Sequence, residues 1–184
     1  RNQRLQRYRI VPFTPAGPHH AAGPWFGTVA VRPGREHGGV LDTPAAGAVG
    51  VSDDGGKTWN TSDPFPAFGT GEATIAELSN GRIYYNSRVH WDQRPKNTRR
   101  RCAWSHDGGG AWKDWQGVDV LPDGHQHRSY GCMGGLTRVP VENRDVLIFS
   151  NIDTPRPARE RATVWASFDG GKTWPVKRLV DAEA

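Results

Sequence analysis

The chain has 184 residues, among them 23 glycines and 14 prolines, and carries a formal net charge of +5. Glycine and proline exceed their average shares of about 7% and 5%, which favours a turn-rich all-β protein over a helical one. The sequence has no apolar run long enough to span a membrane. Its basic residues peak at Arg99-Arg100-Arg101 without forming a long tract, so we expect no nucleic-acid partner.

The first half of the chain is predicted to hold two loops and one hairpin. Residues 14–24 are rich in proline and glycine, and residues 91–100 are rich in charge, so both are predicted to be loops. Residues 74–78 and 82–86 contain β-forming side chains on either side of the turn dipeptide Asn80-Gly81. This arrangement predicts a β-hairpin.

The second half of the chain is also predicted to be built from strands. Residues 145–150 form a short apolar run, and residues 161–167 alternate apolar and polar side chains, so each predicts a strand. Residues 152–160 between them are rich in proline and charge and are predicted to be a loop. No segment shows the apolar period of 3.6 residues that is typical of a helix.

One phrase occurs three times, as SDDGGKTW at residues 52–59, SHDGGGAW at 105–112 and SFDGGKTW at 167–174. The corresponding aspartates, Asp54, Asp107 and Asp169, lie 53 and 62 residues apart, about the size of a propeller blade with its loops. We expect a strand to end at each serine. The aspartate should then accept backbone N–H groups, the glycines should supply positive φ, and the tryptophan should anchor the returning strand.

The sequence predicts neither a metal site nor a cofactor. The repeated phrase is too short for an EF-hand loop and lacks its spaced oxygen ligands and closing glutamate. Cys102 and Cys132 are not in CxxC spacing, so they are either free thiols or one disulfide.

The three phrases resemble Asp-boxes, the hairpin motif of sialidase-type β-propellers. GEATIAELSNGRIYYNSR at residues 71–88 resembles the sialidase segment in which a glutamate precedes a hairpin and an Asn-x-Arg. Residues 147–180 resemble the blade that carries another active-site arginine and its Asp-box. The chain is therefore similar to bacterial-type exo-α-sialidases. This resemblance implies an all-β, six-bladed propeller, of which residues 1–184 would form one partial domain with about three blades.

The resemblance also implies a set of substrate-binding arginines. Sialidases clamp the carboxylate of sialic acid with three arginines. Arginine suits this task because it is always charged and binds a carboxylate in a bidentate manner. Arg88 and Arg159 match two of them. Arg156 and Arg161 lie close enough to Arg159 to remain alternatives.

Glu72 matches the catalytic general base of the family. Sialidases use a tyrosine nucleophile, and a phenol with a pKa near 10 needs a neighbouring base to take its proton. Glu77 is the weaker match because it sits within the hairpin. The four tyrosines here occupy other contexts, and Arg9 is too near Glu72 to be the first clamp arginine. We therefore expect the nucleophile, the acid/base aspartate and the first arginine outside this chain, and residues 1–30 to end an earlier blade.

The resulting functional hypothesis is a fragment of a retaining exo-α-sialidase, inactive by itself, whose substrate is a sialylated glycoconjugate. For the whole protein, the resemblance favours a secreted or periplasmic location. Two alternatives stay open: a non-catalytic Asp-box propeller that binds carbohydrate or protein, and a hydrolase of another α-keto-acid sugar.

Overall fold

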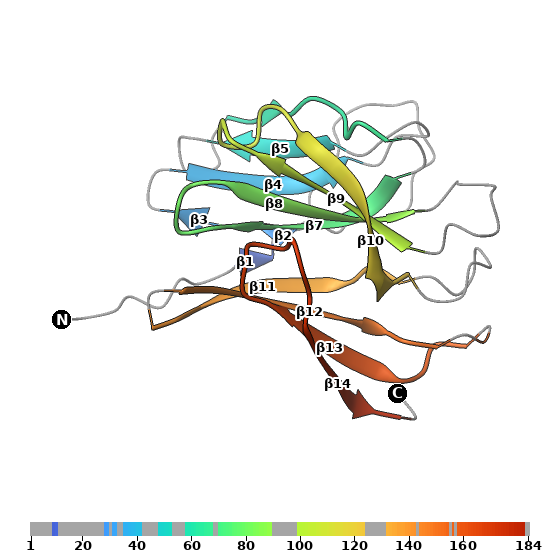
Figure 1. Ribbon diagram of the computed structural model, residues 1–184. Coiled ribbons are helices and arrows are strands. Elements are labelled where there is room, and N and C mark those ends of the chain that lie inside the picture. Colours follow the sequence, from blue (N-terminus) through green and yellow to red (C-terminus); the bar gives the residue numbers. More distant parts are fainter. Residues whose placement is uncertain are drawn as a thin grey trace.

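The computed structural model describes the chain in segments, shown in Figure 1. These are residues 9–10, 28–29, 31–32, 35–41, 48–52, 58–67, 70–89, 99–123, 132–142, 144–154, 156 and 158–182, with side chains described from Ala48 onward. Within these residues the regular structure consists of β-strands, and every strand pair is antiparallel. The prediction of an all-β fold is confirmed.

The strands form three four-stranded sheets and one short pair. The first sheet contains β3 (Val31–Arg32), β4 (Arg35–Leu41), β5 (Ala48–Ser52) and β6 (Asn60–Thr61). The second contains β7 (Thr70–Glu77), β8 (Ile83–Val89), β9 (Arg99–Ser105) and β10 (Lys113–Pro122). The third contains β11 (Gly135–Val141), β12 (Arg144–Ile152), β13 (Ala162–Ser167) and β14 (Val176–Asp181). The pair is β1 (Arg9–Ile10) with β2 (Thr28–Val29).

Each four-stranded sheet is a meander whose strands follow one another in chain order, as expected of a propeller blade. β7, the first strand of the second sheet, contacts β4 of the first sheet and β11 of the third. The second sheet therefore lies between the other two, and Figure 1 shows the third sheet packed beside it.

The predicted hairpin is confirmed as β7 and β8, and its turn explains why the sequence folds this way. Gly81 adopts a φ of +82°, and its N–H donates to the Leu78 carbonyl over 3.0 Å. The Asn80 side chain accepts the Arg82 N–H over 3.1 Å. Asparagine and glycine thus close the turn in the manner that their side chains favour.

The two fully described Asp-boxes have the predicted form. They join β9 to β10 and β13 to β14, and the first two glycines of each, Gly108 and Gly109 and Gly170 and Gly171, take positive φ. The Asp107 carboxylate accepts the N–H groups of Gly110 and Ala111, and the Asp169 carboxylate accepts that of Thr173. The first phrase lies between β5 and β6, but residues 53–57 are outside the described residues.

The tryptophans of the repeated phrase differ in burial. Trp112 and Trp174 are buried, as predicted. Trp59 is 40% exposed, so in the described residues it does not anchor its strand in the core as the others do.

The Asp-boxes also join neighbouring sheets. The indole N–H of Trp104 donates to the Gly170 carbonyl over 2.8 Å, and the Tyr84 ring packs beside Trp174. The indole N–H of Trp112 reaches the Asp63 carbonyl over 3.1 Å. Each of these two described phrases therefore closes its own hairpin and packs against the preceding sheet, which fixes the sheets relative to one another.

The structure corrects the end of one predicted loop and shows the state of the two cysteines. The predicted loop at residues 91–100 is wrong at its end, because β9 begins at Arg99 and Arg100 is completely buried within it. Cys102 and Cys132 are both free thiols, which settles the choice left open between thiols and a disulfide.

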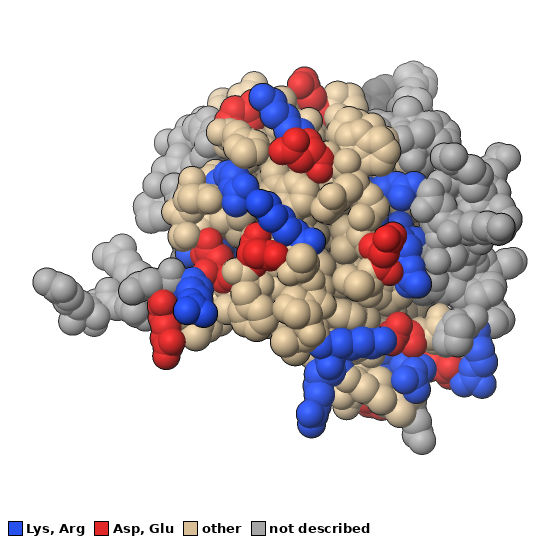
Figure 2. All heavy atoms as spheres, viewed as in Figure 1, with Lys and Arg blue, Asp and Glu red and all other residues tan. Residues whose placement is uncertain are grey.

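Basic and acidic side chains are interspersed over much of the face drawn in Figure 2. Among the described residues, no helix is long and apolar enough to cross a membrane.

Candidate active site

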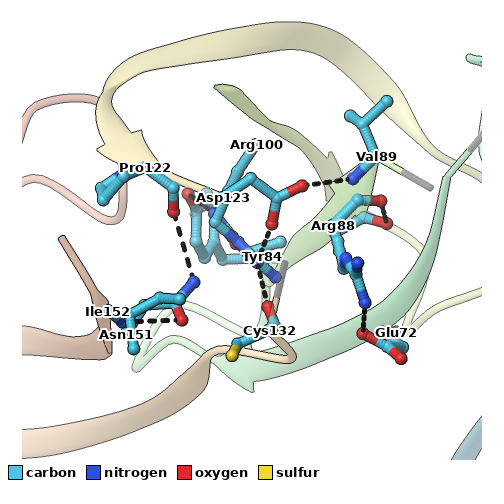
Figure 3. Close-up of polar contacts among 12 residues, drawn as sticks. Glu72, Tyr84, Arg88, Val89, Arg100, Pro122, Asp123, Cys132, Asn151 and Ile152 are labelled. Carbon is cyan, nitrogen blue, oxygen red and sulfur yellow. Dashed lines mark hydrogen bonds and ion pairs between the residues drawn. The ribbon is translucent and has the colours of Figure 1, made fainter. Parts of the chain in front are cut away.

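The structure brings two of the predicted site residues into direct contact. The Arg88 Nη1 atom donates to the Glu72 Oε2 atom over 2.6 Å, as Figure 3 shows. The Arg88 side chain is 8% exposed, whereas the Glu72 side chain is 37% exposed. A guanidinium fixed in the protein thus lies beside a carboxylate that solvent can reach.

A β-bulge explains the placement of Glu72. The register between β7 and β8 shifts between Gly71, which is opposite Arg88, and Ala73, which is opposite Ser87. Glu72 is the extra residue and has a φ of +45°, a left-handed conformation that is uncommon for glutamate. Bulges often re-aim a side chain next to an active site, and strained backbone concentrates at such sites.

Polar side chains continue beneath Arg88 on the same face of β8, because alternate residues of a strand share a face. Asn86 is fully buried and donates from Nδ2 to the Tyr84 hydroxyl oxygen over 3.0 Å. Burial is the main cause that raises the pKa of Tyr84 well above its usual value. Tyr84 is therefore poorly suited to act as a nucleophile.

Tyr85, on the other face of β8, is also fully buried and stacks on Phe65. Tyr8 and Tyr130 lie outside the described residues.

A buried ion pair, which the sequence analysis missed, lies next to these residues. The Arg100 Nη1 atom donates to the Asp123 Oδ1 atom over 2.8 Å and to the Cys132 carbonyl over 3.3 Å. Its Nε atom donates to the Asn86 side-chain oxygen. Figure 3 shows Arg100, Asp123 and Cys132 grouped beside Arg88.

The sequence held one signal for the buried arginine. Arg99 is exposed, Arg100 is buried and Arg101 is intermediate, and the strand continues into Cys102. Alternate residues of a strand share a face, so Arg100 is expected on the same inner face as Cys102. The run of three arginines instead suggested a charged surface.

Arg159 lies on the connection between β12 and β13 and is exposed. Its charge lowers the pKa of the Cys132 thiol, as does that of Arg88, while Glu72 and Asp123 raise it. Burial is the largest cause, so the net pKa of this thiol is raised. Of the three predicted site residues, the structure shows a direct contact between Glu72 and Arg88.

The two alternative arginines have other partners. Arg156 is 72% exposed at its side chain and forms an ion pair of 2.6 Å with Glu160. Arg161 donates from Nε to the Asp153 carbonyl over 3.2 Å. All three arginines therefore stay candidates for the second clamp position.

The start of this connection is held beside the ion pair by Asn151. This residue near the end of β12 donates from Nδ2 to the Pro122 carbonyl over 3.2 Å. Pro122 immediately precedes Asp123, so the third sheet and the end of β10 are joined next to the candidate site (Figure 3).

Among the described residues, no group of three or more His, Cys, Asp or Glu side chains could hold a metal ion. The predicted site residues supply two cationic guanidinium groups, those of Arg88 and Arg159, and one accessible carboxylate, that of Glu72. Such a set suits binding of an anionic ligand, with the carboxylate available to accept a proton.

Comparisons with known proteins agree with this architecture. The family model described as a BNR repeat-like domain matches residues 22–184. The chain is 33% identical over 135 residues to a sialidase of Micromonospora viridifaciens, and 33% identical over 136 residues to a sialidase of Bacteroides fragilis (strain YCH46). These alignments cover 72% and 71% of the chain but 20% and 22% of the relatives, so the chain spans about a fifth of their length.

The fold is also similar to a solved structure, the K499G mutant of NanB sialidase from Streptococcus pneumoniae. The TM-score is 0.64 at 19% sequence identity, covering 80% of this chain and 22% of that one. The three sheets are thus blades of a partial β-propeller. The chain belongs to the BNR repeat-like domain family, and within it is similar to bacterial sialidases.

Proposed function

We propose that the whole protein is a retaining exo-α-sialidase that releases terminal sialic acids from glycoconjugates. In this proposal Glu72 is the general base, and Arg88 and Arg159 are two of the arginines that bind the substrate carboxylate. The observation that carries the proposal is the contact between Glu72 and Arg88, which combines a buried cation with an accessible carboxylate at a strained bulge.

Each residue would have a distinct task. Arg88 has five N–H donors in a fixed fork, so it can keep its contact with Glu72 and still offer donors to a carboxylate. Glu72 would accept the proton of a phenol as that phenol oxygen bonds to the anomeric carbon, while the glycosidic C–O bond breaks and the acid/base aspartate protonates the departing oxygen. The phenol, the acid/base aspartate and the third arginine are assigned to parts of the whole protein beyond this sequence.

The test is hydrolysis of a fluorogenic N-acetylneuraminic acid α-glycoside by the full-length protein that contains residues 1–184. Turnover that is lost in Glu72→Gln would support the proposal. Binding of the sialoside without turnover would instead favour a carbohydrate-binding propeller. Turnover of a matched α-glycoside of another keto-acid sugar, with none of the sialoside, would show that the sugar has been misassigned.

A further inference from the structure

The ion pair between Arg100 and Asp123 lies deep in the protein, with side chains that are 0% and 1% exposed. A buried ion pair is weak evidence for stability, because removing both charges from water costs about as much as their attraction returns. Burial lowers the pKa of Arg100, and the charge of Asp123 opposes that effect. This costly arrangement therefore calls for a role other than stabilisation.

Asp123 contacts the strand that carries Arg88. Its Oδ2 atom accepts the N–H of Val89 over 2.8 Å, while its Oδ1 atom is held by Arg100. Val89 directly follows Arg88 and is buried at the end of β8. One carboxylate thus ties the buried cation to the backbone next to the candidate clamp arginine.

The position of this contact is significant because the sheet opens there. The pairing between β8 and β9 ends at Ser87 and Arg101, so Val89 lies beyond it. On the other side, β7 still pairs with Arg88 and Val89. Asp123 therefore takes the place that a neighbouring strand would otherwise occupy, and it holds the end of β8 from the side that lacks strand pairing.

The charge of Asp123 also matters to Arg100. Burial is the largest cause that lowers the pKa of Arg100, and the charge of Arg88 acts in the same direction, while Asp123 opposes both. Asp123 thus compensates the charge of Arg100 within the protein and keeps one oxygen on Arg100 and the other on the Val89 N–H.

We propose that Asp123, oriented by Arg100, is a positioning residue that sets the location of the Arg88 guanidinium for binding the substrate carboxylate. This inference rests on the proposed function, because it assumes that Arg88 binds a carboxylate. Asp123 would act through the backbone at Val89 and would not touch the substrate.

The test uses the full-length protein and two ligands, DANA and its methyl ester. DANA is the inhibitor bound to Trypanosoma rangeli sialidase in a solved structure. The ester keeps the sugar ring but removes the charged carboxylate, so the ratio of the two dissociation constants reports on carboxylate recognition. A purely structural role of Asp123 would weaken both ligands alike.

In Asp123→Asn we expect DANA to bind about tenfold more weakly, while binding of the ester changes less than twofold. Asp123→Glu keeps the charge but moves the carboxylate relative to Val89, so it should lose the same selectivity. If Asp123→Asn does not fold, Asp123→Glu still tests the inference, because its carboxylate keeps a negative charge beside Arg100.

Asp145→Asn is the control, because it weakens another ion pair, that of Asp145 with Arg138. Asp145 also accepts the N–H and hydroxyl of Ser79, but this contact lies at the turn of the β7–β8 hairpin, at the end away from Arg88. This variant should leave the ratio unchanged. An unchanged ratio in folded Asp123 variants would overturn this inference alone. Failure of the unaltered protein to bind DANA more tightly than the ester would overturn the proposed function and this inference with it.

Discussion

The Oε2 atom of Glu72 lies 2.6 Å from the Nη1 atom of Arg88, although the two residues are 16 positions apart in the sequence. In the β7–β8 hairpin Arg88 lies opposite Gly71 and Glu72 is the extra residue of the bulge, so the two side chains meet at the same end of the hairpin. One local hairpin thus brings the proposed base and the proposed clamp arginine into contact. The following predictions apply to the full-length protein that contains this sequence.

Replacing Glu72 by glutamine should lower kcat by about 10²–10⁴-fold with little change in KM, because the amide can still accept a hydrogen bond from Arg88 but cannot take a proton. Steady-state kinetics with a fluorogenic sialoside measure both constants. Glu77→Gln is the control, since Glu77 ends the same strand. Equal losses in the two variants would contradict the assignment of the base.

Arg159→Ala should raise KM by about tenfold or more, because a hydrogen bond between charged groups contributes roughly 1.5–3 kcal/mol. Arg156→Ala should change KM less than twofold, because Arg156 is exposed and paired with Glu160. The same kinetic assay compares them. A larger effect from Arg156→Ala would transfer the clamp role to that residue.

Gly171→Ala should destabilise the fold more than Gly81→Ala. Both glycines have positive φ, so an alanine is strained at either position. A Cβ at Gly171 would also meet the Tyr84 ring at 2.4 Å, whereas nothing lies within 4 Å of one at Gly81. We expect an additional cost of about 1–3 kcal/mol at Gly171, measured by urea unfolding. Equal costs would show that the Asp-box does not pack tightly against the second sheet.

Stability should fall on acidification as Asp169 is protonated. Burial acts to raise its pKa, but hydrogen bonds from Thr173 and Ser167 outweigh that effect and hold the pKa below its usual value. The stabilisation is therefore complete above the unfolded-state pKa of about 3.9 and is lost as the pH falls through the lower folded-state value.

Asp169→Asn should consequently lose less stability than the unaltered protein when urea midpoints are compared between pH 5 and pH 3. Asparagine can still accept the Thr173 N–H but does not titrate in this range. An identical pH dependence in both proteins would mean that Asp169 is not one of the groups responsible.

Local chemistry made much of the fold predictable. Asn80-Gly81 determined the hairpin, and the spacing of serine, aspartate and glycine determined the Asp-box turns. Glu72 and Arg88 could be proposed because residues 71–88 resemble the sialidase segment in which a glutamate precedes a hairpin and an Asn-x-Arg. Such features depend on neighbours in the sequence.

Features that depend on distant residues were not predictable. Arg100 was predicted to lie in a charged loop. Alternation along the strand could have placed it on an inner face, but its partner Asp123, 23 residues later, could not be predicted from neighbouring residues. The bulge at Glu72 directly follows Gly71, and a glycine within a strand often marks a bulge, but the sequence analysis did not use this signal. Trp59 follows the same phrase as Trp112 and Trp174 yet is more exposed, because burial depends on what packs against each blade.

The most direct test of the account is a crystal structure of the full-length protein with DANA bound. We predict that one ligand carboxylate lies within hydrogen-bonding distance of both Arg88 and Arg159, with Glu72 facing the same pocket. A carboxylate bound away from Arg88, or an Arg159 side chain directed to a different face of the propeller, would contradict it.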